Sequence, residues 1–411
     1  MYRPPSAFGL SDLRYGMRGL NNYHLSCCVN TLLQTLSATW ELGDLLEKWE
    51  ATGVDSHNVP LQLKSVLSAM RSDLPQPAPH HDFLHCLDRN CVRINMQHDA
   101  DEVFLALLNF IQQQMDDKSL ARKIQDLYKI SVETHLRCLE CFSIQTQSSY
   151  HLSLPLHIKE DHNTLESCMN SFFEQQELRG INCCFCSACE KKTSSEQAVR
   201  LLSLPPILCI HLKRFRNSHG YTRKLDCRVT FPETFDFHDI VKKAFCTDFA
   251  QNDCIYTLYA VVVHSGTAMF GHYTAYVRHW RNQRWYYADD SDVHEASWEE
   301  VKSTYGDIYR GTAYMLMYRR ESKEVNKAAE RPSPSHLQPV MVKLEDDIIL
   351  VSERQLVIGP LSSSSGTGQT EHTSGARQCN SDALGFSRVA GGASVLTESQ
   401  EASKRGAPIQ L

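Results

Sequence analysis

The chain has 411 residues, of which 42% are hydrophobic and 22% are charged, and its formal net charge is −6. That length suffices for two domains or for one large domain with a tail, and the mildly acidic balance gives no reason to expect nucleic acid as a partner. Sixteen cysteines would suggest disulfides in a small secreted protein, but this chain is long and residues 1–6 lack the apolar run of a signal peptide. No apolar stretch reaches transmembrane length. We therefore expect reduced thiols in a protein of the cytoplasm, with the nucleus as a further option.

The first predicted element is a helix that begins at Cys27. Apolar residues follow it at the spacing of one buried helical face: Val29, Leu32, Leu33 and Leu36. Ser26 precedes them as a candidate N-cap. A thiol at a helix N-terminus is favoured as thiolate because the positive end of the helix dipole lies there. Asn22, in the loop just upstream, could direct its amide at an oxygen that becomes negative during acyl transfer.

A second helix is predicted to begin near Asp99, after the irregular Pro-rich break at residues 75–79. Asp99 and Glu102 have the spacing of a capping box. One apolar face follows them: Phe104, Leu107, Leu108 and Ile111. The two acids could serve only as caps, or they could bind a cationic ligand.

Two Cys-x-x-Cys pairs come next, and 44 residues separate them. They consist of Cys138 with Cys141 and of Cys186 with Cys189, so they can supply four thiolates to a tetrahedral zinc ion. The long interval indicates two separate hairpins clamped at one end rather than a small finger fold. Cys183 also stands three residues before Cys186, which makes the frame ambiguous, and four thiols without metal are the alternative.

The second half of the chain is rich in predicted strands, among them residues 207–210, 256–263 and 314–318. Residues 273–279 and 284–288 read as a hairpin. Folding it about residues 280 and 281 places His272 opposite Asp289. Helices over residues 19–115 followed by strands over 130–320 predict an α+β fold.

Cys27, His272, Asp289 and Asn22 together supply a nucleophile, a general base, an acid that orients the base, and an oxyanion donor. Those are the parts of a cysteine protease. A cysteine at a helix start is otherwise usually a small buried residue. Asp290 is either plain turn polarity or a second acid near His272, and His211 is more simply read as a structural strand residue.

Five segments, in order, resemble the motifs of the ubiquitin-specific protease family. They are residues 19–34 around Cys27, residues 97–102, residues 211–215, residues 264–273 and residues 285–290. The resemblance implies a papain-like core with a helical thumb, a β-rich palm and zinc-stapled β fingers over residues 19–320. An extension would precede it at residues 1–18, and a disordered tail would follow at 321–411.

The same resemblance implies a thiol-dependent isopeptidase that removes a ubiquitin-like modifier from lysines of its target proteins. Gln97, Asp99, Glu102 and His264 would then bind the modifier's tail. The likeness is greatest to the interferon-induced member, which acts on a two-domain ubiquitin-like modifier and is linked to restraint of type I interferon signalling at the receptor. A general deubiquitinase, a weakly active scaffold on the same fold, and a papain-like hydrolase of another substrate class are the alternatives.

The chain departs from the family pattern beside the thiol. The family usually has Gly where His24 stands, a small polar residue or Asn where Leu25 stands, and an aromatic residue where Cys28 stands. A side chain at position 24 could restrict the oxyanion loop, because Gly reaches backbone conformations that His reaches only at a cost.

Within the polar tail, residues 345–353 combine four consecutive aliphatic residues with flanking acids. Such a segment can add as a strand to a partner's sheet edge, and it resembles the motif that binds the ubiquitin-like modifier SUMO. The alternative is one sticky patch that occurs by chance in a disordered segment.

Overall fold

The computed structural model describes residues 17–53, 55–72, 74–218, 221–240, 254–306 and 311–321. Three predictions concern residues outside these ranges: the N-terminal residues 1–16, the tail beyond residue 321, and the segment 345–353 that resembles a SUMO-binding motif. No helix within the described ranges is both long enough and apolar enough to cross a membrane.

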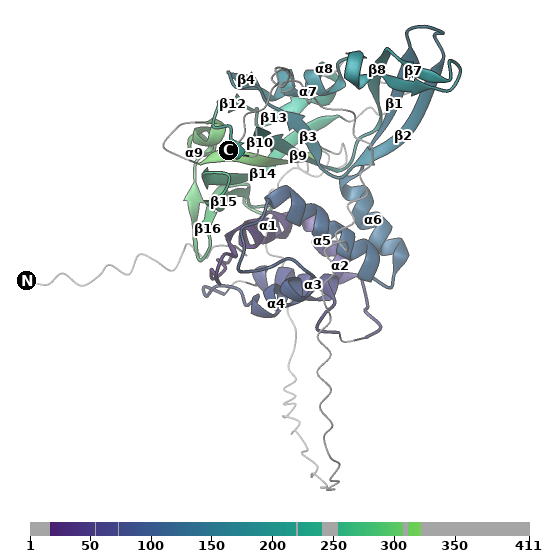
Figure 1. Ribbon diagram of the computed structural model, residues 1–411. Helices are drawn as coiled ribbons and strands as arrows, with labels where there is room; N and C mark the ends of the chain where they lie inside the picture. The colour runs from purple at the N-terminus through teal and green to yellow at the C-terminus, as the bar shows by residue number, and fades with distance from the viewer. Residues whose placement is uncertain are drawn as a thin grey trace, which may run out of the picture. The chain divides into compact units, whose positions relative to one another are not determined.

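Six helices fill residues 27–128, drawn from purple to blue in Figure 1. Their bounds are Cys27–Ala38 for α1, Trp40–Glu47 for α2, Val59–Met70 for α3, His81–Arg89 for α4, Ala100–Gln114 for α5 and Lys118–Tyr128 for α6. Asn58, Asp99 and Asp117 cap α3, α5 and α6 by accepting backbone N–H groups of the first turn. The predicted helices at Cys27 and Asp99 are therefore confirmed, and so is the Pro-rich break between α3 and α4.

An eight-stranded sheet follows, with the order β17-β16-β15-β14-β18-β9-β3 and with β13 paired to β14. Its strands are β3 Leu154–His157, β9 Ile207–Lys213, β13 Thr234–Asp236, β14 Ile255–Gly266, β15 Gly271–Arg278, β16 Trp285–Asp289, β17 Asp292–Ala296 and β18 Thr312–Arg320. All neighbours are antiparallel except β3 and β9. The expected α+β architecture is confirmed, because helices precede this sheet and pack against it.

The central strand β14 is covered on both faces. Ala260 and Val262 belong to the core shared with the helices, whereas Val261 and Val263 belong to the core on the other face. A register shift at Leu258 and Ala260 interrupts this alternation against β18. α1 packs against β14 and β15 (Figure 1). Cys27 at the start of α1 interacts with His272 at the start of β15.

A second sheet has the order β2-β1-β8-β5 and projects beyond the helices in Figure 1. The remaining strands are β1 Ile130–Cys138, β2 Ile144–His151, β4 Asn163–Thr164, β5 Gln176–Leu178, β6 Cys184–Cys186, β7 Lys191–Thr193, β8 Ser195–Ser203, β10 Phe215–Ser218, β11 Tyr221–Lys224 and β12 Val229–Thr230. The remaining helices are α7 Leu165–Phe173, α8 Phe237–Ile240 and α9 Trp298–Lys302, with 3₁₀ turns η1 Gly180–Asn182 and η2 Ser303–Tyr305. β1 with β2 and β6 with β7 are the two predicted hairpins.

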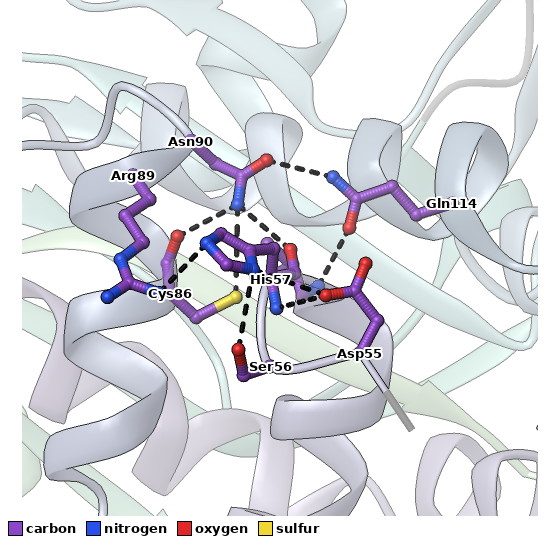
Figure 2. Close-up of polar contacts among 8 residues, drawn as sticks. Asp55, Ser56, His57, Cys86, Arg89, Asn90 and Gln114 are labelled. Carbon is purple, nitrogen blue, oxygen red and sulfur yellow. Dashed lines mark hydrogen bonds and ion pairs between the residues drawn. The ribbon is translucent and has the colours of Figure 1, made fainter. Parts of the chain in front are cut away.

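The C-terminal end of α4 is fastened to its neighbours by side-chain amides (Figure 2). Asn90 donates to the carbonyls of His57 and Cys86, at 3.1 and 2.8 Å, and accepts from Gln114 of α5 at 3.0 Å. Arg89 approaches His57 Nε2 at 2.8 Å. These bonds join α4 to the start of α3 and the end of α5, and they fix its position in the helical layer.

Candidate active site

Cys27 is the first residue of α1 and is 6% exposed. The apolar face predicted behind it is buried, with no residue of the four above 4% exposure. Ser26 holds the N-cap position but does not cap: its Oγ accepts from the backbone of Tyr23 at 2.9 Å and donates to Asn22 Oδ1 at 3.3 Å. The Ser26 side chain thus bonds within the loop before the thiol and accepts no backbone N–H from the first turn of α1. The prediction that Ser26 caps the helix was wrong.

Cys28, the next residue of α1, is buried like Cys27. It is 2% exposed, and burial raises the pKa of its thiol well above the usual value. Cys86 of α4 is 1% exposed, and burial raises the pKa of its thiol to about 11. Both remain protonated near neutral pH, so neither can serve as a nucleophile.

His272 lies at the start of β15, and its Nε2 is 2.7 Å from Asp289 Oδ1 at the end of β16. The Cys27 thiol interacts with the same imidazole. The hairpin register differs from the prediction by two residues: Ala275 pairs with Ala288, so His272 and Asp289 are diagonal rather than direct neighbours. A shift of two keeps both side chains on the same face of the sheet, which is why they still meet.

The pKa of His272 is raised to about 9. The hydrogen bond with Cys27 is the largest cause, and the hydrogen bond with Asp289 adds to it, while burial opposes both. Near neutral pH the imidazole therefore holds its proton, which is the state that pairs with a thiolate nucleophile.

Asn22 is fixed by a carboxylate. Its Nδ2 donates to Asp290 Oδ2 at 2.7 Å, and Nδ2 of Asn30 on α1 donates to Asp290 Oδ1 at 2.7 Å. Asp290 also lies within 4.8 Å of the ligand atoms of His272 and Asp289. Its role is thus more than turn polarity, because it joins the loop before the thiol to the strand that carries Asp289.

The two loops also approach each other through their backbones. Leu20 N–H donates to the Asp290 carbonyl at 2.8 Å. A Cβ on Gly19 would lie 2.2 Å from the Ser291 carbonyl oxygen, so only glycine fits there without moving the backbone.

Four thiols gather where the two hairpins meet. Cys141 Sγ is 3.5 Å from Cys186 Sγ, and Cys138 Sγ is 3.9 Å from Cys189 Sγ. All four sulfurs lie within 4.8 Å of one another, and a tetrahedral zinc with Zn–S bonds of about 2.3 Å needs S···S distances of roughly 3.8 Å. The donor set fits a metal ion.

The structure also settles the ambiguous frame of the cysteines. Cys183 and Cys184 contact Ser194 Oγ and the Asn182 carbonyl instead of joining the cluster. Cys138 Sγ accepts the Glu140 backbone N–H at 3.4 Å. A hydrogen bond from the Cys141 backbone is the largest cause that lowers the pKa of Cys138 to about 6. Such bonds favour the thiolate form that a metal requires.

The family described as ubiquitin carboxyl-terminal hydrolase matches residues 18–318. This chain belongs to that family. Ubl carboxyl-terminal hydrolase 18 of Homo sapiens is 33% identical over 319 residues, covering 75% of this chain and 86% of that protein. The Mus musculus protein of the same name is 32% identical with the same coverage. Ubiquitin carboxyl-terminal hydrolase 47 of Homo sapiens is 26% identical over 385 residues, covering 75% of this chain and 28% of that protein.

As a member of this hydrolase family, the protein is a cysteine protease that acts on ubiquitin or ubiquitin-like conjugates. The predicted resemblance is therefore confirmed at the level of family and enzyme class. The geometry of Cys27, His272 and Asp289 agrees with that class.

Gln97 of the predicted tail-binding motif clamps the catalytic strand. Its Nε2 donates to the Gly271 carbonyl at 2.8 Å, and its Oε1 accepts the Gly271 N–H at 2.9 Å. Gly271 immediately precedes His272, so this two-point contact fixes the backbone that carries the imidazole.

The two acids of the motif lie together at the start of α5. Asp99 Oδ1 accepts the N–H groups of Asp101 and Glu102, at 2.8 and 3.2 Å, and its Oδ2 accepts the Tyr314 hydroxyl. Burial, followed by the charges of Asp99 and Asp101, raises the pKa of Glu102. This crowding of negative charge would be relieved by a cation at the surface.

His264 does not line an open surface. It is 2% exposed, and a Cβ on Gly271 would lie 2.1 Å from its Nε2. Burial, with Lys224 as the next cause, lowers the pKa of His264 to about 4. His264 is therefore a neutral support beneath Gly271, since a direct contact with the tail would require it to leave the core. His211 is likewise interior and lies 3.0 Å from Asp101 and 3.1 Å from Tyr314.

The backbone at His24 has φ of 62°. This left-handed conformation is natural for glycine and strained for histidine, as the departure from the family pattern suggested. Leu25, the other departure, is 40% exposed and donates its N–H to Ile94 at 3.1 Å.

Asn30 and the clamp made by Gln97 were not predicted from the sequence. Asn30 lies one turn after Cys27 on a helix whose residues are nearly all buried, and a buried amide needs hydrogen-bond partners, so its position was a usable signal. The Gln97 clamp had no local signal, because its partner is 174 residues away.

Proposed function

We propose that this protein is a thiol isopeptidase that removes a ubiquitin-like modifier, and specifically the interferon-induced two-domain modifier, from lysines of its targets. The preference for that modifier rests on the identity of 33% across 75% of the chain to Ubl carboxyl-terminal hydrolase 18. The chemistry rests on the juxtaposition of Cys27, His272 and Asp289.

In the first step, Cys27 Sγ attacks the carbonyl carbon of the modifier's terminal glycine. Asp290 holds one N–H of the Asn22 amide, and the second N–H is available to the oxyanion that forms. His272 gives its proton to the departing lysine Nζ as the C–N bond breaks, which leaves a thioester and a free amine.

In the second step, neutral His272 accepts a proton from water as that water attacks the thioester carbonyl. The C–S bond breaks, the modifier leaves with a free carboxyl group that loses its proton to solvent, and His272 is again protonated beside the thiolate. Asp289 keeps the imidazole oriented throughout, because its carboxylate is hydrogen-bonded to Nε2.

Asp99 and Glu102 are proposed to receive basic side chains of the modifier's tail. Burial, followed by the charges of Asp99 and Asp101, raises the pKa of Glu102, and a basic side chain beside it would offset these effects. Gln97 would act with them by holding the start of β15 against α5.

The paired hairpins are proposed to contact the modifier's globular body. Large apolar side chains are exposed on them, among them Phe142, Ile144 and Phe185, at 60%, 59% and 60%. We propose zinc as the ion for Cys138, Cys141, Cys186 and Cys189, because four thiolates at tetrahedral spacing suit zinc. When bound, the ion would fasten the hairpins to each other.

A role in restraining type I interferon signalling, and a place in the cytoplasm with access to receptor components, extend the proposal. The signalling role rests on the sequence resemblance, and the cytoplasmic location rests on the cysteine content read as reduced thiols. A weakly active scaffold is the second candidate, and the strained backbone at His24 favours it.

A panel of activity probes tests these proposals. Each probe carries an electrophile at the C-terminus of one modifier, and the rate of adduct formation at Cys27 is measured for the full chain and for Cys27→Ala. We expect the fastest adduct with the two-domain modifier and none with Cys27→Ala. Equal rates, or a preference for ubiquitin, would make the protein a general deubiquitinase. Binding without any adduct would support the scaffold.

A further inference from the structure

Two exposed histidines face each other on α4. His81 and His85 are one helical turn apart, and their Nε2 atoms are 3.1 Å from each other. The ring centroids are 4.2 Å apart, with the planes at 83°. Residues four apart share one helical face, so the helix itself directs both nitrogens to the same point.

The spacing of the two nitrogens suits a shared metal ion. With Zn–N bonds of about 2.0–2.1 Å in a tetrahedral site, two ligand nitrogens lie roughly 3.4 Å apart. The observed 3.1 Å is within a few tenths of an ångström of that value. Without metal, one ring donates an Nε2–H to the other. With metal, each ring binds through Nε2 and keeps its hydrogen on Nδ1.

The helix holds this pair in a fixed position. Its opposite face is formed by Phe83, Leu84, Cys86 and Leu87, none of which exceeds 1% exposure. The amide network of Asn90 and Gln114 in Figure 2 fastens its C-terminal end. Little backbone freedom therefore remains to be lost on binding, which favours affinity.

We propose that His81 and His85 form a binding site for a divalent transition metal ion of the class of Zn²⁺, Cu²⁺ or Ni²⁺. Imidazole nitrogens suit these ions, whereas Mg²⁺ and Ca²⁺ require oxygen ligands. Within the described part of the chain, these histidines belong to no group of three or more metal-binding side chains. Water completes the coordination, so the ion exchanges readily, in contrast to an ion held by the four thiols.

The site adjoins the loop that leads to the thiol. The Tyr23 ring lies edge-on to His81, with centroids 5.3 Å apart and planes at 73°. Tyr23 N–H donates to Ser26 Oγ, one residue before Cys27. A metal that fixes the His81 ring therefore alters the surroundings of Tyr23, which provides a spectroscopic reporter.

Calorimetric titration of the full chain with Zn²⁺ tests the proposal, with the four-thiol site filled beforehand and loosely bound metal removed. The comparison is with the double variant His81→Ala, His85→Ala and with His294→Ala, which removes an exposed histidine of β17. We expect one more binding event in the wild type and in His294→Ala than in the double variant. Binding elsewhere, including at His272, is common to all three proteins and cancels.

Nuclear magnetic resonance with ¹⁵N-labelled histidine identifies the ligands directly. The Nε2 resonances of His81 and His85 should shift together on addition of Zn²⁺, together with the Tyr23 ring protons. In His85→Ala the His81 resonance should shift much less at the same concentration. Equal stoichiometry in the wild type and the double variant, or unmoved Nε2 resonances, would overturn the proposal.

Discussion

Cys27 and Cys28 are adjacent in the sequence and both are buried, yet Cys27 is the largest cause of the raised pKa of His272, whereas burial raises the pKa of the Cys28 thiol itself. At the scale of single residues, the site depends on which atoms each side chain can reach. Three residues yield predictions: His272 as the base, Asn22 as the oxyanion donor and His24 with its strained backbone.

The pH profile should report the raised pKa of His272. A raised pKa means that the protonated form is kept until the pH rises through about 9, so kcat/KM should fall above that pH. Asp289→Asn removes a carboxylate that raises this pKa and should move the alkaline limb to lower pH. Asp292→Asn, an exposed acid on β17, serves as the control. An unmoved limb in Asp289→Asn would contradict this account.

Asn22→Ala should lower kcat by on the order of 10²-fold with little change in KM, because an oxyanion donor acts in the transition state. Asp290→Asn should lower kcat by less, since it loosens the Asn22 amide without removing it. Steady-state hydrolysis of a modifier-amide substrate separates the two parameters. A negligible effect of Asn22→Ala would assign the oxyanion to backbone donors.

His24→Gly should raise the free energy of unfolding by up to about 1 kcal/mol, because glycine adopts positive φ without the steric cost of a Cβ. Leu25→Gly is the matched control, since positive φ occurs at His24 and not at Leu25. Urea denaturation compares the two variants with the wild type. Lower stability in His24→Gly than in the wild type would show that its side-chain contacts outweigh the strain.

At the scale of elements, α1, β15 and the start of α5 meet at the site, and Gln97, in the segment before α5, hydrogen-bonds to Gly271 at the start of β15. The start of α1 supplies the thiol, β15 supplies the base, and the segment before α5 holds β15. Displacement of any one element moves its catalytic group relative to the others.

Gln97→Ala should lower kcat/KM by about 10- to 100-fold, because small displacements of a catalytic group are costly. Gln97→Glu keeps an acceptor for the Gly271 N–H but cannot donate to its carbonyl, so it should fall between Ala and the wild type. Gln113→Ala, an exposed glutamine on α5, should leave turnover unchanged. Equal activity of all three variants would show that β15 needs no clamp.

At the scale of the whole molecule, the two hairpins come from distant parts of the chain and meet through four cysteines. Exposed polar contacts also join them, because Gln145 Nε2 donates to Ser187 Oγ at 2.9 Å and Lys191 Nζ lies 2.8 Å from Glu140 Oε2. A bound ion would add a further link, and its binding free energy would contribute to folding.

Protein freed of loosely bound metal should contain one zinc per chain by elemental analysis. Cys186→Ser should lose that zinc and unfold at a lower temperature, because the hairpins lose their common ligand. Cys183→Ser, which alters a thiol outside the cluster, should retain both zinc and thermal stability. A stable wild type that contains no zinc would contradict the assignment.

The sequence alone determined the features that depend on local spacing. The helix at Cys27, the cap at Asp99, the paired hairpins and the pairing of His272 with Asp289 all followed from periodicity or from fixed intervals. The resemblance to family motifs added the order of the site-forming segments along the chain. Even the hairpin register, wrong by two residues, kept the correct face because side chains alternate with a period of two.

Only the tertiary structure decided which distant groups meet and which are enclosed. Asp290 reaches Asn22 across 268 positions, and Gln97 reaches Gly271 across 174. His264, placed at the cleft by its motif, proved to be buried beneath Gly271. Burial and long-range contact arise when elements pack, and no local pattern contains them, so these features could not be predicted from the sequence.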